Sequence, residues 1–215
     1  MAGLNAARVR ENADRIRAEV DAAARRAGRD PADVELLAAV KYVELEDVGA
    51  LLEGGVTLLG ENRAQELEKK AAAWPDARWH FIGQLQSRKV KQILPLVELI
   101  HSVASDSALR QLERHGTPET EVLVEVNVAG EEGKAGIAPG ELPAVLERAP
   151  VRVVGLMGMP PFTDDPERSR PHFAALRELA REHGLRELSM GTSQDYRVAV
   201  EEGATIVRLG TSLYT

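Results

Sequence analysis

The sequence predicts an α/β protein, a single closed (β/α)8 TIM barrel with an additional N-terminal helix. Two observations carry this prediction. Eight short apolar or β-branched segments recur along the chain, and segments with helical periodicity separate them. No linker or shift in composition divides the 215 residues, so residues 1–215 are expected to form one domain. Because the chain is short for such a barrel, an open sheet of six or seven strands remains the alternative.

The first expected element is an amphipathic helix over residues 4–28. Val9, Ile16 and Val20 lie on one apolar stripe, and the turn at Asp30-Pro31 follows its end. The strands are then expected at residues 36–41, 56–60, 79–83, 98–103, 121–128, 151–158, 187–190 and 205–209. The alternating helices are expected at residues 44–53, 62–73, 87–94, 106–115, 139–148, 166–183 and 194–202.

Glycine and proline mark the ends of several of these helices. Gly54-Gly55 stops one helix, and Gly184 and Gly203 stand where C-terminal glycines belong. Asp165-Pro166 supplies an N-cap and a first-turn proline to another. These signals support the alternating order of strands and helices.

The composition excludes several classes of site. The chain has no cysteine, which rules out disulfides and thiol catalysis, and its five histidines lack metal-binding spacing. A net charge of −7 argues against nonspecific nucleic-acid binding. The N-terminal segment lacks a secretory pattern, and no apolar run approaches the roughly 20 residues of a membrane helix. We therefore expect a cytoplasmic protein that does not bind membranes.

Lys41 is the first candidate functional residue. It ends an apolar run in a chain with 27 basic residues, of which only six are lysines. Alternation along the strand puts Leu37, Ala39 and Lys41 on one face, and an inward face would aim the amine into the mouth of the barrel. Lysine forms Schiff bases, best when burial lowers its pKa. The alternative is a strand-end lysine that extends into solvent.

Two similar clusters, Gly191-Thr192-Ser193 and Gly210-Thr211-Ser212, follow the last two expected strands. Barrels commonly bind phosphate there, because glycine lets backbone N–H groups approach an anion and hydroxyls add donors. A helix beginning near Gln194 would also favour an anion. Alone, each cluster could be a capped strand-to-helix turn. Together with Lys41 they suggest pyridoxal 5′-phosphate as the cofactor.

Arg208 lies two residues before Gly210 and is expected to face the same side. Its guanidinium could donate to the pyridine nitrogen of the cofactor but could not protonate it, because arginine keeps its proton. Pyridoxal enzymes that need a strong electron sink usually place a carboxylate there. An arginine therefore predicts a weak electron sink. The alternative is a strand arginine paired with a surface acid.

Other candidates lie at or near strand ends. Asn62, His80 and Met157 are included as cofactor-binding candidates, although a core histidine and a packing methionine are the commoner roles of such residues. Lys134, in a glycine-bounded loop, could be a second amine. The basic patch from Arg88 to Lys91 could bind phosphate or a partner, or simply be solvated.

Several motifs occur in order along the chain. They are Val40-Lys41, Gly60-Glu61-Asn62, Trp79-His80-Phe81-Ile82-Gly83, Val126-Asn127-Val128, Gly155-Leu156-Met157, Met190-Gly191 with Ser193 and Asp195, and Val207-Arg208-Leu209-Gly210-Thr211. Together they resemble the pyridoxal phosphate homeostasis proteins, relatives of the N-terminal barrel of bacterial alanine racemase. Val40, Arg88 and the tail Leu213-Tyr214-Thr215 depart from the family pattern.

The resemblance implies that pyridoxal phosphate is held on Lys41 as an internal aldimine, with its phosphate near Ser193, Gly210 and Thr211. It implies that Arg208 faces the ring nitrogen. It further implies a monomer that binds, buffers and delivers the cofactor in vitamin B6 homeostasis, with pyridoxal-phosphate-dependent enzymes as clients. On this basis the protein is expected not to be an enzyme.

Three alternatives stay open. A small pyridoxal-phosphate-dependent amino-acid racemase or lyase would need a second base, because racemisation requires a base on each face of Cα. Alanine racemase supplies that base from a further domain, and here Tyr42 or Tyr196 would have to act. A class I aldolase would use Lys41 without the cofactor. A scaffold would bind partners through the Arg88 patch.

Overall fold

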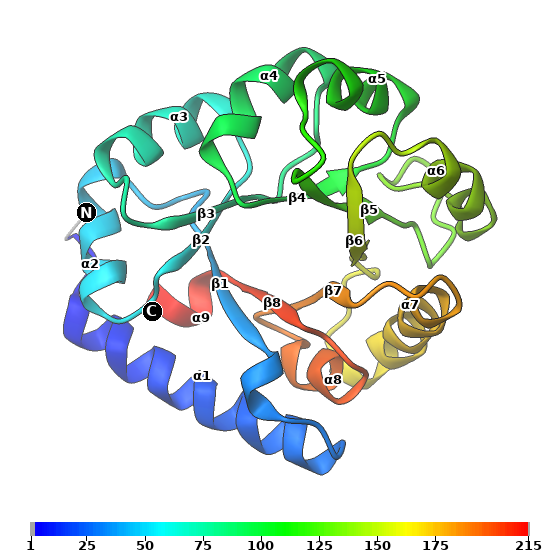
Figure 1. Ribbon diagram of the computed structural model, residues 1–215. Coiled ribbons are helices and arrows are strands. Elements are labelled where there is room, and N and C mark those ends of the chain that lie inside the picture. The colour runs from blue at the N-terminus through cyan, green and yellow to red at the C-terminus, as the bar shows by residue number, and fades with distance from the viewer. Residues whose placement is uncertain (1–2, 215) are drawn as a thin grey trace.

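The computed structural model describes residues 3–214, and it is a closed barrel of eight parallel strands in sequence order with helices around it (Figure 1). The first strand, β1, closes the barrel by pairing with the last, β8, in a register that joins Ala38 to Leu209. The predicted barrel is confirmed, and the open-sheet alternative is wrong. Thr215, in the tail that departs from the family pattern, lies outside the described residues.

The observed strands overlap all the predicted ones. They are β1 (Glu35–Ala39), β2 (Leu58–Glu61), β3 (Arg78–Phe81), β4 (Leu99–Val103), β5 (Glu121–Glu125), β6 (Arg152–Met157), β7 (Glu187–Thr192) and β8 (Ile206–Leu209). Four of them, β1, β3, β5 and β6, are shorter at their carboxyl ends than predicted. Strand β1 stops two residues before Lys41, and β5 stops at Glu125, although the backbone N–H groups of Val40 and Val126 still donate to the carbonyls of Gly60 and Met157.

The helices also follow the predicted order. They are α1 (Ala6–Arg26), α2 (Val48–Glu53), α3 (Ala64–Ala73), α4 (Val90–Ile93), α5 (Asp106–His115), α6 (Leu142–Arg148), α7 (Arg170–Glu182), α8 (Tyr196–Glu201) and α9 (Thr211–Tyr214). The additional helix α1 starts at Asn5, whose side chain accepts a hydrogen bond from the backbone N–H of Arg8. Helix α9 was not predicted, because one turn after a glycine carries no periodic signal.

The apolar core has two layers. Most buried apolar residues lie between the strands and the helices. A smaller cluster fills the inside of the barrel and consists of Leu37, Leu58, Leu99, Leu123, Met157 and Ile206. Leu37 is in this inner cluster, as the alternation along the first strand predicted, so the face that it shares with Ala39 is the interior face.

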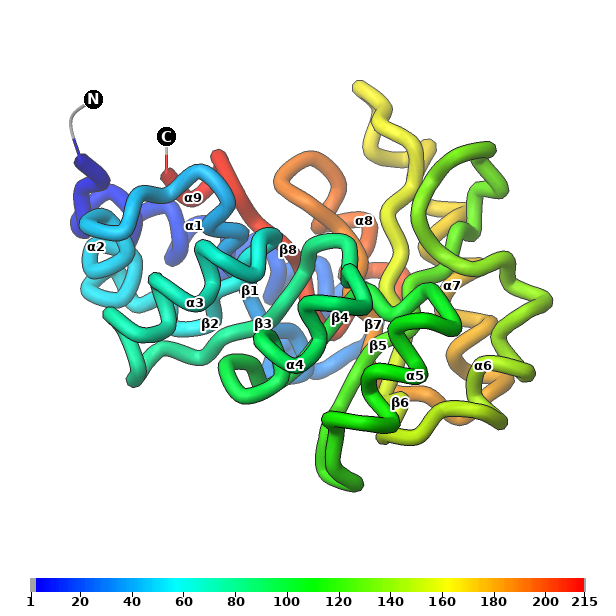
Figure 2. Tube along the Cα trace, turned by 90° about the horizontal axis from the view of Figure 1, so that it is seen from above, coloured from blue at the N-terminus to red at the C-terminus, as the bar shows by residue number. Residues whose placement is uncertain are grey.

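Helix α1 packs against α2, α8 and α9, and so covers the seam where the barrel closes (Figure 1). In Figure 2 the yellow segment between β6 and α7 rises from the barrel on the same side as α9. That segment exposes Phe162, and Met159 before it is also largely exposed. In the described part of the chain, residues 3–214, no helix has the length and apolar character needed to cross a bilayer.

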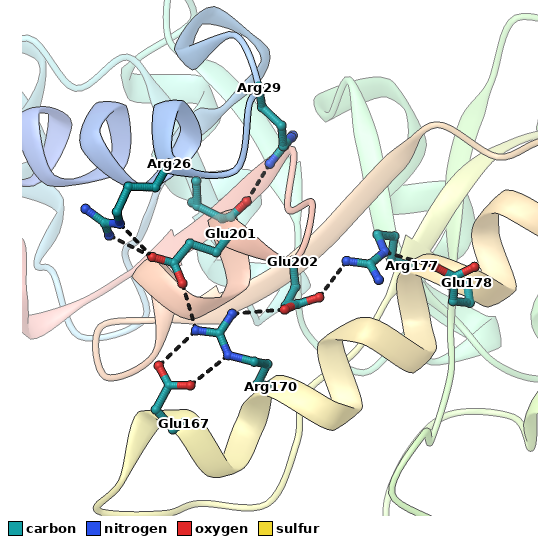
Figure 3. Close-up of polar contacts among 9 residues, drawn as sticks. Arg26, Arg29, Glu167, Arg170, Arg177, Glu178, Glu201 and Glu202 are labelled. Atoms are coloured by element: carbon teal, nitrogen blue, oxygen red, sulfur yellow. Dashed lines mark hydrogen bonds and ion pairs between the residues drawn. The ribbon is translucent and has the colours of Figure 1, made fainter.

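A network of ion pairs joins α7 to α8 and α1 (Figure 3). Arg170, at the start of α7, pairs with Glu201 at 2.7 Å and with Glu202 at 2.9 Å. It also pairs with Glu167 in the preceding turn, and Glu201 in turn accepts from Arg26 at the end of α1. The network therefore fixes the helices that flank the turn after β7.

Candidate functional site

A pocket of about 540 Å3 opens at the carboxyl ends of the strands, where the barrel fold places its sites. We call it the mouth pocket. All the predicted cofactor-binding residues except His80 line it: Lys41, Asn62, Met157, Ser193, Arg208, Gly210 and Thr211. Closure of the barrel thus brings the amine next to both late glycine turns.

Lys41 lines this pocket from a turn rather than from a strand. Strand β1 ends at Ala39, and the exposed Lys41 has its Nζ 4.7 Å from the centroid of the Tyr42 ring. The strand predicted at residues 36–41 therefore ends two residues earlier than expected, at Ala39. The interior face continues only to Ala39, which also lines the pocket, and Lys41 lies at its rim.

The two late turns form one cluster, as predicted. Ser193 Oγ accepts a hydrogen bond from the backbone N–H of Gly210 at 3.1 Å and lies 2.9 Å from Ser212 Oγ. Gly191 has φ of +89°, and a Cβ there would lie 2.5 Å from the Cβ of Ala199, so only glycine fits. The cluster combines hydroxyls and backbone N–H groups, which is the donor set that a phosphate requires.

The helix after the first of these turns begins later than predicted. Helix α8 starts at Tyr196 rather than near Gln194 and has six residues. The carboxylate of Asp195 accepts from the backbone N–H of Thr192 at 2.8 Å and closes the turn. The donors near the pocket are therefore those of the turn itself.

Arg208 is buried at the floor of the pocket. Its Nη1 donates to the carbonyl oxygen of Ser189 at 2.7 Å and to Ser189 Oγ at 2.5 Å, and its Nη2 donates to the carbonyl of Gly158 at 3.1 Å. Burial lowers the pKa of Arg208 to about 10, against the attraction of Glu125 and Asp195, so it stays cationic at neutral pH. Its hydrogen bonds go to β7 and the end of β6 rather than to a surface acid.

Behind Arg208, hydrogen bonds run through the inside of the barrel. Ser189 Oγ lies 2.8 Å from Nδ1 of His101, and His101 Nε2 lies 2.9 Å from Nδ1 of His80. Because a guanidinium only donates, Ser189 Oγ accepts from Arg208, and its own proton is free for Nδ1 of His101. That leaves the proton of His101 on Nε2, directed at His80. We call these four residues the Arg208 chain.

Both histidines of this chain are neutral. Burial, with a contribution from Arg78, lowers the pKa of His80 to about 3. Burial also holds the pKa of His101 well below its usual value, with contributions from His80 and Arg208. The Arg208 chain therefore carries a single positive charge, on Arg208, at the end that faces the mouth pocket.

His80 itself does not reach the mouth pocket. It lines a separate pocket of about 580 Å3 together with Arg78, Glu98 and Glu121, at the amino ends of the strands. In β3 its register partner is Leu99, the first residue of β4, which sets His80 low in the barrel. His80 therefore does not contact a ligand of the mouth pocket, and it has the commoner role of a hydrogen-bonded core histidine.

Sequence reasoning missed Glu125, which also lines the mouth pocket. Its side chain is buried, which raises its pKa, while the charge of Arg208 acts in the opposite direction. The signal was available, because Leu123 is an inner-cluster residue and Glu125 is two positions further along the same face of β5.

The remaining candidates lie apart from the pocket or at its edge. Lys134 pairs with Glu131 at 2.9 Å and is not a lining residue. Arg88 is in an exposed turn, where it contacts Gln86. The hydroxyl of Tyr196 donates to Glu19 on α1 and thus faces away from the pocket. Tyr42 does line the pocket.

Comparison with known proteins places this geometry in a family. Residues 12–215 match the family described as alanine racemase, N-terminal domain. A pyridoxal phosphate homeostasis protein of Aquifex aeolicus is 42% identical, over 95% of this chain and 96% of that protein. The protein of the same name from Pseudomonas aeruginosa is 39% identical, over 96% and 94% of the two chains.

Solved structures agree. An unknown protein from Bifidobacterium adolescentis is 31% identical and covers 97% of this chain and 95% of its own, with a TM-score of 0.89. PipY of Synechococcus elongatus with pyridoxal phosphate bound is 30% identical, over 96% and 100%, with a TM-score of 0.79. The alanine racemase of Corynebacterium glutamicum, at 16% identity, shares the fold, with a TM-score of 0.70 over 99% of this chain and 61% of its own. This chain belongs to the pyridoxal phosphate homeostasis proteins, within the alanine racemase N-terminal domain family.

Proposed function

We propose that this protein binds pyridoxal 5′-phosphate in the mouth pocket, bonded to Lys41, and serves vitamin B6 homeostasis as a carrier. The observation that carries the proposal is the presence in one pocket of an amine, a buried guanidinium and two joined glycine turns. These groups match the aldehyde, the ring nitrogen and the phosphate of the cofactor. The names of the relatives and the cofactor bound to PipY support it.

Each residue has a part in this proposal. Lys41 would hold the cofactor through its amine, because a lysine amine can form a C=N bond with the aldehyde and release water. Ser193, Gly210 and Thr211 bind the phosphate through hydroxyl and backbone donors. Arg208, held by Ser189, faces the ring nitrogen. Asn62 and Met157 line the rest of the pocket and limit the positions that the ring can take.

The carrier role follows from the kind of donor at the ring nitrogen. When bound, the cofactor supplies an electron sink, which is strong only if the ring nitrogen is protonated. Arg208 stays cationic and gives no proton to it, since its pKa is about 10. Tyr196 is turned toward Glu19, which leaves Tyr42, a pocket-lining residue, as the remaining tyrosine that could act as a second base. The lack of a proton donor at the ring nitrogen disfavours fast turnover of amino acids.

Glu125 favours one alternative, a small pyridoxal-phosphate-dependent racemase or lyase. It is a buried carboxyl group with a raised pKa in the same pocket as Lys41, which is the environment of a general base. Incubation of the loaded protein with single enantiomers of amino acids separates the two functions. The carrier predicts no multiple-turnover racemisation or cleavage. Sustained turnover that is lost in Glu125→Gln would establish the enzyme.

Absorbance spectra test the attachment to Lys41. The wild-type protein mixed with pyridoxal phosphate should show a band near the edge of the visible range that borohydride removes. Lys41→Ala should lack this band while remaining folded, because an exposed side chain at a turn contributes little packing. Lys134→Ala is the matched control and should keep it. A Lys41→Ala protein with the unchanged band would overturn the assignment.

We further propose that the protein acts as a cytoplasmic monomer and passes the cofactor to the apo forms of pyridoxal-phosphate-dependent enzymes. The exposed position of Lys41 at the rim supports the transfer of the cofactor, because the bond to Lys41 can be reached from solvent. Mixing the loaded protein with such an apoenzyme should restore the activity of that enzyme faster than spontaneous release of the cofactor from the diluted complex would allow. Light scattering of the loaded protein should give the mass of a single chain.

A further inference from the structure

Side chains replace strand partners at the end of β1, just before Lys41. Strand β1 pairs with β8 as far as Ala38 and with β2 as far as Ala39. The backbone N–H of Val40 still donates to the carbonyl of Gly60 at 2.9 Å. Successive carbonyls of a strand point to opposite sides. The carbonyls of Ala39 and Val40 therefore point toward β8 and β2, and each accepts from a side chain. The carbonyl of Val40 also accepts from the backbone N–H of Val43 at 3.1 Å.

On the β2 side the donor is Lys70 of α3. Its Nζ donates to the carbonyl of Val40 at 2.8 Å and to Glu61 Oε2 at 2.7 Å. Glu61 Oε1 accepts in turn from the backbone N–H groups of Asn62 and Arg63, at 2.6 and 3.1 Å. The side chains of Lys70 and Glu61 are 3% and 0% exposed. Desolvation offsets much of the attraction in such a pair, so its clearest effect is to fix position.

On the β8 side the donor is Tyr214, the last residue of α9. Its hydroxyl donates to the carbonyl of Ala39 at 2.7 Å, and Figure 1 shows α9, in red, beside β1. Burial, together with the nearby Glu61, raises the pKa of Tyr214 far above its usual value, so the hydroxyl keeps its proton. Helix α9 begins at Thr211, in the turn after β8 that is proposed to bind the phosphate, and is one turn long. Tyr214 thus joins the turn after β8 to the end of β1, two residues before Lys41.

We propose that Tyr214 couples phosphate binding at the start of α9 to the placement of the Lys41 amine, while Lys70 holds the other side of the same strand end. Tyr214 and Lys70 are positioning residues, since neither lines the mouth pocket. The inference rests on the proposed function. It adds that the two halves of the site cooperate through one hydroxyl group.

Pyridoxal, which lacks the phosphate, provides the test. Tyr214→Phe keeps the ring in its place and removes one hydrogen bond, so affinity for pyridoxal phosphate should fall about fivefold. Affinity for pyridoxal should change less, by under about twofold, because no phosphate then contacts the start of α9. Equal losses for the two ligands, or none for pyridoxal phosphate, would overturn the coupling.

Two further variants complete the design. Tyr196→Phe is the matched control, because it removes a hydroxyl that faces Glu19 on α1, and it should leave both affinities unchanged. The double variant Lys70→Met with Glu61→Gln removes both buried charges together and should weaken the two ligands by equal factors. A loss confined to pyridoxal phosphate there would contradict the role given to Lys70.

The outcomes also separate this inference from the proposed function. If wild-type protein forms no adduct at Lys41, the proposed function fails. If wild-type protein forms it and Tyr214→Phe behaves as Tyr196→Phe does, only the coupling fails. Thermal unfolding of each variant shows whether it is folded. If Tyr214→Phe is not folded, the single variant Thr211→Ala tests the coupling instead. It should lose affinity for pyridoxal phosphate and also form the bond at Lys41 more slowly. An unchanged rate of bond formation would contradict the coupling.

Discussion

The charge at the floor of the mouth pocket depends on single residues inside the barrel. Arg208 is held by Ser189, and Ser189 is oriented by His101, so the guanidinium has little freedom to rotate. The price of this arrangement is two buried histidines that must stay neutral. Their pKa values lie below the usual range because burial disfavours the charged ring.

These lowered pKa values predict sensitivity to acid. Below about pH 6.5 the unfolded state binds a proton at each histidine and the folded state does not, so lowering the pH favours unfolding. For His80 the loss continues down to its folded pKa of about 3. Between neutral pH and about pH 5, His80 should lower the free energy of unfolding by about 2 kcal/mol, and His101 should change it in the same direction. Urea denaturation at the two pH values measures it.

Variants identify the source of that loss. His101→Leu should be less stable at neutral pH but lose less stability on acidification than the wild-type protein. His115→Leu, on the exposed end of α5, is the control and should leave the buried contribution in place. An equal pH dependence in wild type and His101→Leu would show that His101 is not a source.

Single residues differ in how well the sequence predicts them. Lys41, Ser193 and Gly210 follow strands of a regular barrel and Arg208 lies in the last strand, so strand order alone brings them together. His80 was misassigned because the sequence does not show how high in the barrel a strand residue lies; register with β4 decides that. Tyr214 was missed as a positioning residue because its hydroxyl meets a backbone carbonyl far away in the sequence.

At the scale of elements, the boundaries depend on local tertiary contacts more than on the sequence pattern. The helix predicted at residues 166–183 begins with a 3-10 turn at Pro166–Ser169 and becomes α-helical only at Arg170. The same residue forms the centre of the network in Figure 3, which fixes α7 against α8. Periodicity predicts that a helix exists, and such contacts determine where it starts.

Removing the centre of this network should destabilise the fold. Arg170→Met leaves three carboxylates without their shared partner, and we expect the free energy of unfolding to fall by about 2 kcal/mol. Arg181→Met, which breaks a single exposed pair with Glu178 on the same helix, should cost less than about 0.5 kcal/mol. Chemical denaturation measures both. Equal effects would show that the network adds nothing beyond separate pairs.

At the scale of the whole molecule, the site is a product of barrel closure. Pairing of β1 with β8 sets Lys41 beside the turns that follow β7 and β8, although they stand at opposite ends of the sequence. The count and order of strands were enough to predict that arrangement. The Arg208 chain could not be predicted, because its four residues come from four strands and meet only at particular heights inside the barrel.

A crystal structure of the protein soaked with pyridoxal phosphate tests the central claim most directly. The account predicts continuous density from Lys41 Nζ to the cofactor, the phosphate within hydrogen-bond distance of Ser193 and Gly210, and the ring nitrogen facing Arg208. A cofactor bonded to another lysine, or a phosphate bound away from both late turns, would contradict it.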